Sequence, residues 1–562
     1  MRSRAASSVP ELKVRVARPL DEQPDDLPPQ RLLVGQSRVA VGRRPGAAWW
    51  AALWLLASVL PCRPAEGRYL HVVRKFADTM MAHGTDRYGT VHSPLLAAML
   101  DLRTLELPVQ SLPEEFFKGD GQLREVYGFG FPDPPVGVRP MDRAPMGNNL
   151  EHDINLLRSM YALSFLTRDG KYAAHADACL RFWLLNCQSP ETGLMASGEH
   201  NSWDFIREKA WSDTHEVYRR FPFWDRLYDI DPYRAVRIAD GMWMAQIGNK
   251  KVGDFSRHAG YHHYRAETGA AYPRHAGFYI WAYANAYVQT RDPKYIHRIE
   301  VLIESRTGRQ PRPFSLLVDP QGFQPERSLD PTLRLLLWEA AGLVPQRREA
   351  WRKLVRELDE EEFSRTKTLL PSAADSLPSA TEKEKASAAR YNELARPGRV
   401  LVVAGGARTL STTLSPIWRM SYGSSGVSGR ALLELTRYDQ TQDPRFLRRA
   451  EEIADCFVEE GIPEVKSDLW PGAAGQVISL MVSLAGRKTT PAEKAIRYRA
   501  FARQVADMAI ELFSCNGLFR ADGTAQHYEA ITGADDLLWG LLQLHCALHN
   551  EPLQLGHNDV NL

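Results

Sequence analysis

Helical periodicity runs through almost the whole chain and is the feature that most restricts its fold. From residue 68 onward, apolar residues return at intervals of three and four, the spacing of amphipathic helices. Strand patterns are few and short, the clearest being residues 401–406, so a parallel sheet is not expected. The pattern predicts about a dozen helices, at residues 68–81, 155–166, 175–186, 233–247, 277–288, 295–304, 333–344, 431–438, 446–461, 474–484, 498–513 and 535–548.

Three of these helices end in nearly the same sequence, at residues 167–172, 290–295 and 441–446. Each of the three has a threonine, an aspartate, Gly or Pro, a basic residue and an aromatic before the next helix, which predicts a repeated helical hairpin. The repeats begin 123 and 151 residues apart, too irregular a spacing for an open solenoid. We therefore expect an all-α fold, an (α/α) toroid of six or seven hairpins in one large domain spanning residues 67–562.

The first 66 residues differ from the rest. Residues 1–45 are rich in Arg, Pro and Ser and are interpreted as a disordered tail or as a wrongly assigned start. Residues 46–66 contain an apolar run that follows Arg43 and Arg44; it is short for a membrane span and typical of an export signal. We expect an exported protein, periplasmic, cell-surface or secreted, with membrane contact only through an N-terminal anchor.

The composition restricts the class of partner. Lys and Arg number 70 against 68 Asp and Glu, so no basic excess favours nucleic acid, and an anionic partner must be met by a local patch. Residues 345–400 pass from a charged helix into a Ser, Ala, Glu and Lys segment with few large apolar residues. This range is predicted to be a low-complexity excursion from the toroid.

Histidines and acids gather in residues 197–263. Gly198-Glu199-His200 reads as a loop, His215-Glu216 as the start of a helix, and Arg257-His258 as a loop bracketed by Gly253 and Gly260. Taken alone, each has an ordinary reading: a capping histidine, a first-turn acid, a surface arginine. Together, two imidazoles and a carboxylate are the ligand set of an open divalent-metal site.

The same segment resembles the pectate lyases of polysaccharide lyase family 2. That family has a Gly-Gly-His loop, a His-Glu helix start, a Pro-aromatic pair, a turn ending in proline, and an Arg-His loop in this order. Here they are matched by GEH, HEVYRRFPFWDRLYDIDP and DFSRHAGY, with the family's interval of 41 residues from Glu216 to Arg257. The resemblance is clear over residues 194–263. It departs from the family at Glu199, which replaces the second glycine, and in a shorter interval between His200 and Glu216.

The resemblance implies a toroid of seven hairpins and a set of site residues. It makes His200, Glu216 and His258 the metal ligands and Arg257 the catalytic base. It also implies Mn²⁺ or a similar transition metal rather than Ca²⁺, a preference that two imidazoles explain because Ca²⁺ favours oxygen ligands.

The reaction that the resemblance implies is metal-assisted β-elimination on a polyuronate, most simply pectate or polygalacturonate. Arg257 would remove the C5 proton beside the uronate carboxylate, and the neighbouring cations Arg219, Arg220 and Arg265 would favour its neutral form by like-charge repulsion. Residues that would position the acidic polysaccharide or donate the leaving-group proton stay open among His215, Arg219, Tyr261, His262 and His263.

Two other functions stay open. A glycoside hydrolase on the same toroid would use paired carboxylates such as Asp153, Asp213, Asp535 and Asp536. A noncatalytic carbohydrate-binding protein would keep an aromatic groove and lack turnover.

Overall fold

The computed structural model describes residues 67–108, 131–264, 274–307, 331–368, 414–422, 426–553 and 555–557. All of these belong to one compact unit, Cys62–Leu562. The predicted tail and apolar segment, residues 401–406 and most of the excursion after residue 368 lie outside the described residues. Within the described part, no helix has the length and apolar character needed to cross a membrane.

The described unit is built from helices, as predicted. They are α2 (Arg68–Thr79), α3 (Ile154–Thr167), α4 (Lys171–Asn186), α5 (Trp224–Ile230), α6 (Pro232–Ala245), α7 (Arg274–Thr290), α8 (Lys294–Thr307), α9 (Pro331–Leu343), α10 (Arg348–Thr368), α12 (Gly426–Thr441), α13 (Pro444–Glu460), α14 (Pro471–Ala485), α15 (Ala492–Phe513) and α16 (Ala534–His549). Residues 348–368, the first part of the predicted excursion, therefore form an ordinary helix that packs against α9.

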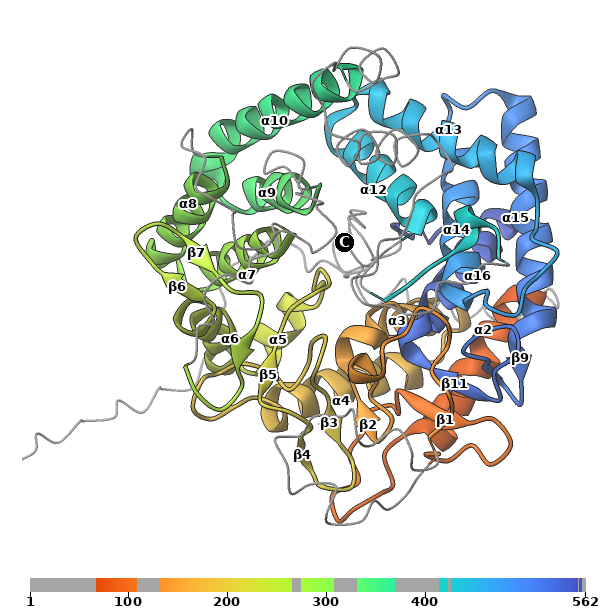
Figure 1. Ribbon diagram of the computed structural model, residues 1–562, viewed down its shortest axis with the longest axis horizontal. Helices are drawn as coiled ribbons and strands as arrows, with labels where there is room; N and C mark the ends of the chain where they lie inside the picture. Colours follow the sequence, from red (N-terminus) through yellow and green to blue (C-terminus); the bar gives the residue numbers. More distant parts are fainter. Residues whose placement is uncertain are drawn as a thin grey trace, which may run out of the picture. The chain divides into compact units, whose positions relative to one another are not determined.

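The helices pair as hairpins that close into a ring (Figure 1). Within the described residues, six hairpins follow the chain: α3/α4, α5/α6, α7/α8, α9/α10, α12/α13 and α14/α15. The last helix, α16, packs against both α2 and α3, so the two ends of the helical sequence form a seventh pair. The predicted all-α toroid is confirmed.

Inner and outer helices differ in burial. In α14 and α16 almost every residue from the first turn onward is buried, which requires apolar and small side chains all round. In α13 only one face is buried, at Phe446, Leu447, Ala450, Ile453, Ala454 and Phe457. The inner helices thus form the wall of the ring core, and the outer helices cover it with a single apolar stripe each.

The repeated hairpin sequence produces the same turn three times. In the second repeat, Thr290 Oγ1 donates to Ala286 O, Asp292 N donates to Thr290 Oγ1, and Lys294 N donates to Asp292 Oδ1. The corresponding bonds are present after α3 and α12. The residue after each threonine has a left-handed backbone, so this turn both ends one helix and caps the next.

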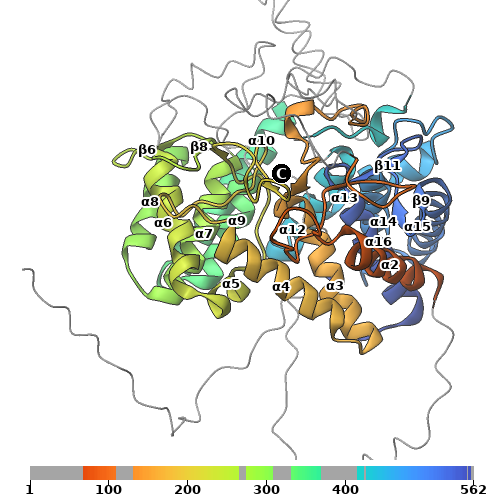
Figure 2. The ribbon, with the colours of Figure 1, turned by 90° about the horizontal axis from the view of Figure 1, so that it is seen from below.

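Short strands occupy the connections. They are β1 (Met99–Asp101), β2 (Gly147–Asn148), β3 (Trp203–Asp204), β4 (Lys209–Ala210), β5 (Thr214–His215), β6 (Ile247–Asn249), β7 (Asp254–Phe255), β8 (Ala259–Gly260), β9 (Ser514–Cys515), β10 (Leu518–Phe519) and β11 (His527–Glu529). Figure 2 shows several of them, including β6, β8, β9 and β11, at one end of the helical ring. The residues with candidate chemistry come from the segments around β3, β5 and β8.

Candidate metal centre

Antiparallel pairing of β5 with β8 places Glu216 beside His258. The register joins His215 to Ala259, so the next position along β5 faces the residue before Ala259. Glu216 therefore follows a strand and lies well before α5, which begins at Trp224. The prediction that Glu216 lies near a helix start is wrong, because strand pairing with the distant Arg-His loop overrides the local sequence pattern.

A glycine brings the third segment against this pair. Gly198 has a φ of +124°, and a Cβ at this position would lie 2.3 Å from the backbone oxygen of Glu216. Only glycine allows the two backbones to approach this closely. Asn149 Nδ2 donates to Gly198 O at 2.7 Å and fixes the loop from the other side. Residues Glu199 and His200 are thereby held over Glu216.

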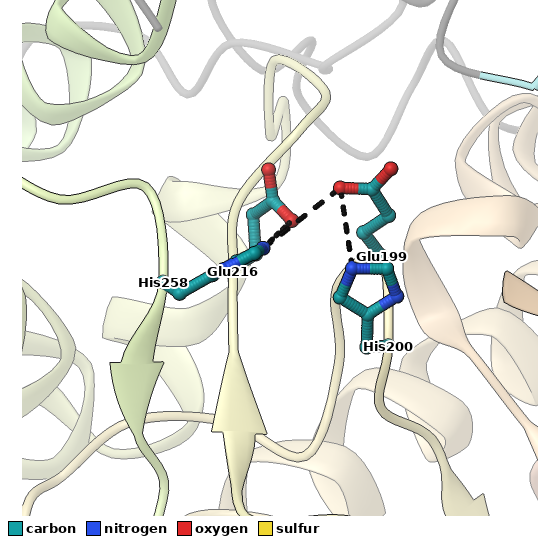
Figure 3. A group of neighbouring side chains, drawn as sticks. All are labelled: Glu199, His200, Glu216 and His258. Atoms are coloured by element: carbon teal, nitrogen blue, oxygen red, sulfur yellow. Dashed lines mark ion pairs between the residues drawn. The ribbon is translucent and has the colours of Figure 1, made fainter. Parts of the chain in front are cut away.

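Four side chains converge where these segments meet: Glu199, His200, Glu216 and His258 (Figure 3). One ligand atom from each lies within 4.8 Å of all the others. His258 Nε2 lies 3.2 Å from Glu216 Oε2, and His200 Nε2 lies 3.6 Å from Glu199 Oε2. The three ligands predicted from the sequence are thus brought together, and Glu199 joins them.

The facing atoms are placed as ligands of one ion would be. Glu216 Oε2 and His258 Nε2 are both buried and form an ion pair with each other at 3.2 Å, but among the described residues neither atom makes a hydrogen bond of acceptable geometry. Buried polar atoms seldom lack a hydrogen bond unless a further group binds them. Two imidazoles and carboxylate oxygens form a donor set that suits a first-row transition metal. The residues present therefore fit the metal ion implied by the resemblance.

Around the centre, charge strongly perturbs the titrating groups. Burial raises the pKa of Glu216, but His258, His275 and Arg257 outweigh it and hold that pKa well below its usual value. Burial lowers the pKa of His258, but its carboxylate neighbours Glu199 and Glu216 raise it to about 9. The carboxylates are thus ionised at neutral pH and carry the negative charge that a cation requires.

Arg257 lies beside the ligands. Its Nη1 donates to Glu199 Oε2 at 2.5 Å and to Glu216 Oε1 at 3.4 Å, and its side chain is 14% exposed. The cations expected to surround it are compensated: Arg219 pairs with Asp535 at 3.1 Å and Arg220 pairs with Glu339 at 2.8 Å. Arg265 lies outside the described residues.

Sequence reasoning gave no role to several residues that contact the centre. His275 Nε2, on the first turn of α7, lies 2.8 Å from Glu216 Oε1. Arg139 binds Asp142 at 2.6 and 3.0 Å and also pairs with Glu199, and Asp142 Oδ1 lies 3.1 Å from His200 Nδ1. The position of Glu199 next to His200 was the one sequence feature that could have indicated its role. His275, Arg139 and Asp142 had no such feature.

The remaining candidates divide by exposure. His215, Arg219 and Tyr261 are buried, and the Tyr261 hydroxyl donates to Cys187 O. His215 and Arg219 line an internal cavity of about 30 Å³, room for a single water molecule. His262 and His263 are exposed on the loop after β8, where His263 Nε2 lies 2.9 Å from Asp213 Oδ2. Of these five candidates, His262 and His263 are the two whose side chains are exposed in the described part of the chain.

Three of the carboxylates considered for a hydrolase lie in the core. Asp153, Asp535 and Asp536 are buried, and they contact Asn148, Asn155, Arg219 and Gln476. The bonds of Asp535 and Asp536 with Asn155 and Gln476 join α16 to α3 and α14. Their placement favours a structural role.

The sequence of residues 138–275 matches the family described as periplasmic pectate lyase. This range contains Arg139, Glu199, His200, Glu216, Arg257 and His258. The resemblance seen over residues 194–263 is confirmed, and the match supports an enzyme that acts on carbohydrate.

Solved structures with a similar arrangement include the GH76A α-1,6-mannanase of Salegentibacter sp. HEL1_6. It is 10% identical, has a TM-score of 0.36, and the alignment covers 85% of this chain and 99% of that one. A family 76 glycoside hydrolase from a bovine Bacteroides thetaiotaomicron strain is 12% identical, with a TM-score of 0.36 and coverage of 86% and 79%. An unsaturated glucuronyl hydrolase specific for heparin is 10% identical, with a TM-score of 0.32 and coverage of 78% and 98%. Likenesses this distant carry no argument about activity or substrate.

Proposed function

We propose that this protein is an exported polysaccharide lyase that cleaves a polyuronate, with pectate or polygalacturonate as the first substrate to test, by metal-assisted β-elimination. The observation that carries the proposal is the convergence of His200, Glu216 and His258, with the Arg257 guanidinium within 3.4 Å of the central carboxylate. Such a site combines a place for a divalent ion with a nitrogen base, the two groups that elimination on a sugar acid needs.

The chemistry begins with a weakly acidic proton. The C5 proton of a uronate is activated by the adjacent carboxylate, which spreads the developing negative charge. A divalent ion bound by His200, Glu216 and His258 would neutralise the uronate carboxylate. It would also weaken the ion pairs that the flanking acids form with Arg257. Mn²⁺ or a similar transition metal fits this donor set better than Ca²⁺.

Arg257 is proposed as the base. Its neutral guanidine nitrogen takes the C5 proton, the C5–H electrons form the C4–C5 double bond, and the C4–O4 bond breaks. The leaving oxygen takes up a proton, so the products are a shortened chain and an unsaturated sugar. Because a guanidinium holds its proton strongly, and Glu199 and Glu216 favour the charged form, the reaction needs these acids to be engaged elsewhere.

Ultraviolet absorbance tests the reaction class. The purified protein is incubated with a panel of polyuronates, with Mn²⁺ and with a chelator, and new absorbance is compared with new reducing ends. A lyase produces both in equal amounts, and only when the metal is present. Reducing ends without absorbance would identify a hydrolase, and the absence of both, together with retained oligosaccharide binding, would identify a noncatalytic binding protein.

A further inference from the structure

The residue before His200 is a carboxylate where the resembling family has glycine. Glu199 is 4% exposed, so a charged side chain has been buried at the centre of the site. Burying a charge is costly unless partners compensate it. We infer that Glu199 is a fourth ligand of the metal ion, positioned by Arg139, which makes this a centre of two imidazoles and two carboxylates. The inference rests on the proposed metal centre and adds a residue to it.

Distances within the group support a ligand role. Glu199 Oε2 lies 3.6 Å from His200 Nε2 and 4.0 Å from His258 Nε2. Donor atoms bound to one ion at about 2.1 Å lie roughly 3–4 Å from one another, so these separations leave room for an ion among them. Figure 3 shows this single oxygen with dashed lines to both histidines. A carboxylate that served only to balance Arg257 would not need to approach both rings.

The other oxygen of Glu199 is anchored. Arg139 pairs with Glu199 Oε1 and binds Asp142 through two further hydrogen bonds. Glu199 Oε2 lies on the side of the imidazoles, where it also accepts a hydrogen bond from Arg257 Nη1 at 2.5 Å. Asp142 in turn lies 3.1 Å from His200 Nδ1. A carboxylate on the far nitrogen of a ligating histidine is the usual arrangement in metal sites, because it fixes the ring and leaves Nε2 for the ion. Arg139 and Asp142 therefore orient two adjacent ligands together.

The charges agree with this assignment. Glu199 and Glu216 supply two negative charges, which equal the charge of one divalent ion. The charge of Arg139 is balanced by Asp142, which it binds through two hydrogen bonds. A second carboxylate also makes the centre harder and shifts it toward Mn²⁺ over softer ions.

Calorimetric titration of the metal-stripped full-length protein with Mn²⁺ tests the inference. Glu199→Gln keeps the shape of the side chain and removes its charge, and we expect Mn²⁺ binding to weaken by at least about tenfold. Glu191→Gln, at an exposed acid on the same segment, is the matched control and should bind as the parent does. Glu199→Asp keeps the charge but withdraws the oxygens, so a ligand role predicts weaker binding for it as well.

The outcomes separate the inference from the proposed function. Parental Mn²⁺ affinity in Glu199→Asp would show that only the charge matters and would overturn the fourth-ligand assignment, as would parental affinity in Glu199→Gln. His200→Ala and Glu216→Gln are run alongside. If those two variants also bind Mn²⁺ like the parent, the metal centre itself is wrong and the proposed function fails with it.

Discussion

Single residues decide the chemistry of the centre, and Arg257 is the one whose role is hardest to replace. It lies on the loop between β7 and β8, with Nη1 against two carboxylates, so its side chain is oriented before any substrate arrives. Lysine would place one compact charge at this point and could not contact both acids with the same geometry.

Replacing Arg257 by alanine should remove the base and leave the metal ligands in place. A general base contributes about 10²–10⁴-fold to a rate, so formation of the unsaturated product should fall by that factor. Mn²⁺ affinity should stay the same or rise, because a nearby positive charge is lost. The measurement is the rate of absorbance increase alongside a calorimetric titration, with Arg181→Ala on the exposed face of α4 as the control. A variant that keeps parental activity would exclude Arg257 as the base.

Glu529 gives a pH prediction away from the centre. Burial raises its pKa, but Arg143 and His527 outweigh this and lower it to about 2. A carboxyl group with a lowered pKa contributes stability that is present above its ordinary value of 4.5 and is lost as the pH falls toward 2. Breaking a buried pair of this kind costs about 3–5 kcal/mol.

Glu529→Gln should therefore reduce the free energy of unfolding by about this amount at pH 7 and by much less at pH 3. Urea denaturation at the two pH values measures the difference, and Glu511→Gln on the exposed face of α15 is the control. An equal loss at both pH values would show that the ionised pair is not the cause.

Residue types in one segment suggested an open metal site, and the family resemblance assigned His200, Glu216 and His258 as its ligands and Arg257 as the base. Arg139 and Asp142 could not be predicted. They lie about 60 residues before Glu199, in a short 3-10 turn with no motif, and only the folded ring brings them to the site.

A secondary-structure element can be predicted from the sequence where it depends only on residues a few positions apart. The helices and the three hairpin turns were predictable, since apolar spacing and the Thr-x-Asp sequence act within a few residues. The strand at residues 214–215 was not, because its partner is 45 residues away. Strand pairing over that sequence distance depends on the surrounding fold, and a two-residue strand is too short to show an alternating apolar pattern.

The second hairpin turn allows a test of the shared turn. Asp292→Ala removes the side chain that accepts a hydrogen bond from Lys294 N at the start of α8, and should cost about 1 kcal/mol of unfolding free energy. Arg291 has a φ of +58°, so Arg291→Gly should be neutral or slightly stabilising. Chemical denaturation compares the two variants with the parent. If Asp292→Ala is as stable as the parent, the aspartate is not capping the helix.

Across the whole molecule, the ring depends on close contact between inner helices. Gly475 of α14 lies against the backbone of α16, where an added Cβ would be 2.3 Å from the carbonyl carbon of Asp536. Asp536 of α16 also accepts hydrogen bonds from Asn155 of α3 and Gln476 of α14. Strain where α14 crosses α16 therefore also affects the contacts that close the ring. The helical pattern alone left the number of hairpins at six or seven, since α2 and α16, which form the last pair, lie at opposite ends of the helical sequence.

Gly475→Ala should therefore destabilise the protein by about 1–3 kcal/mol, because the contacted atoms are backbone and cannot move aside alone. Gly342→Ala provides the contrast. Nothing lies within 4 Å of a Cβ at that helical position, so alanine should add about 0.5–1 kcal/mol through its better helix propensity. Thermal unfolding of the two variants beside the parent measures both signs. Equal effects would mean that the α14–α16 crossing is not tight.

The most direct test of the account is a diffraction experiment on crystals of the Arg257→Ala variant grown with Mn²⁺ and a short oligogalacturonate. The account predicts one anomalous peak within bonding distance of His200 Nε2, His258 Nε2 and a Glu216 oxygen, with a uronate carboxylate on the same ion. An anomalous peak elsewhere, or a centre that holds the sugar with no ion among these side chains, would contradict it.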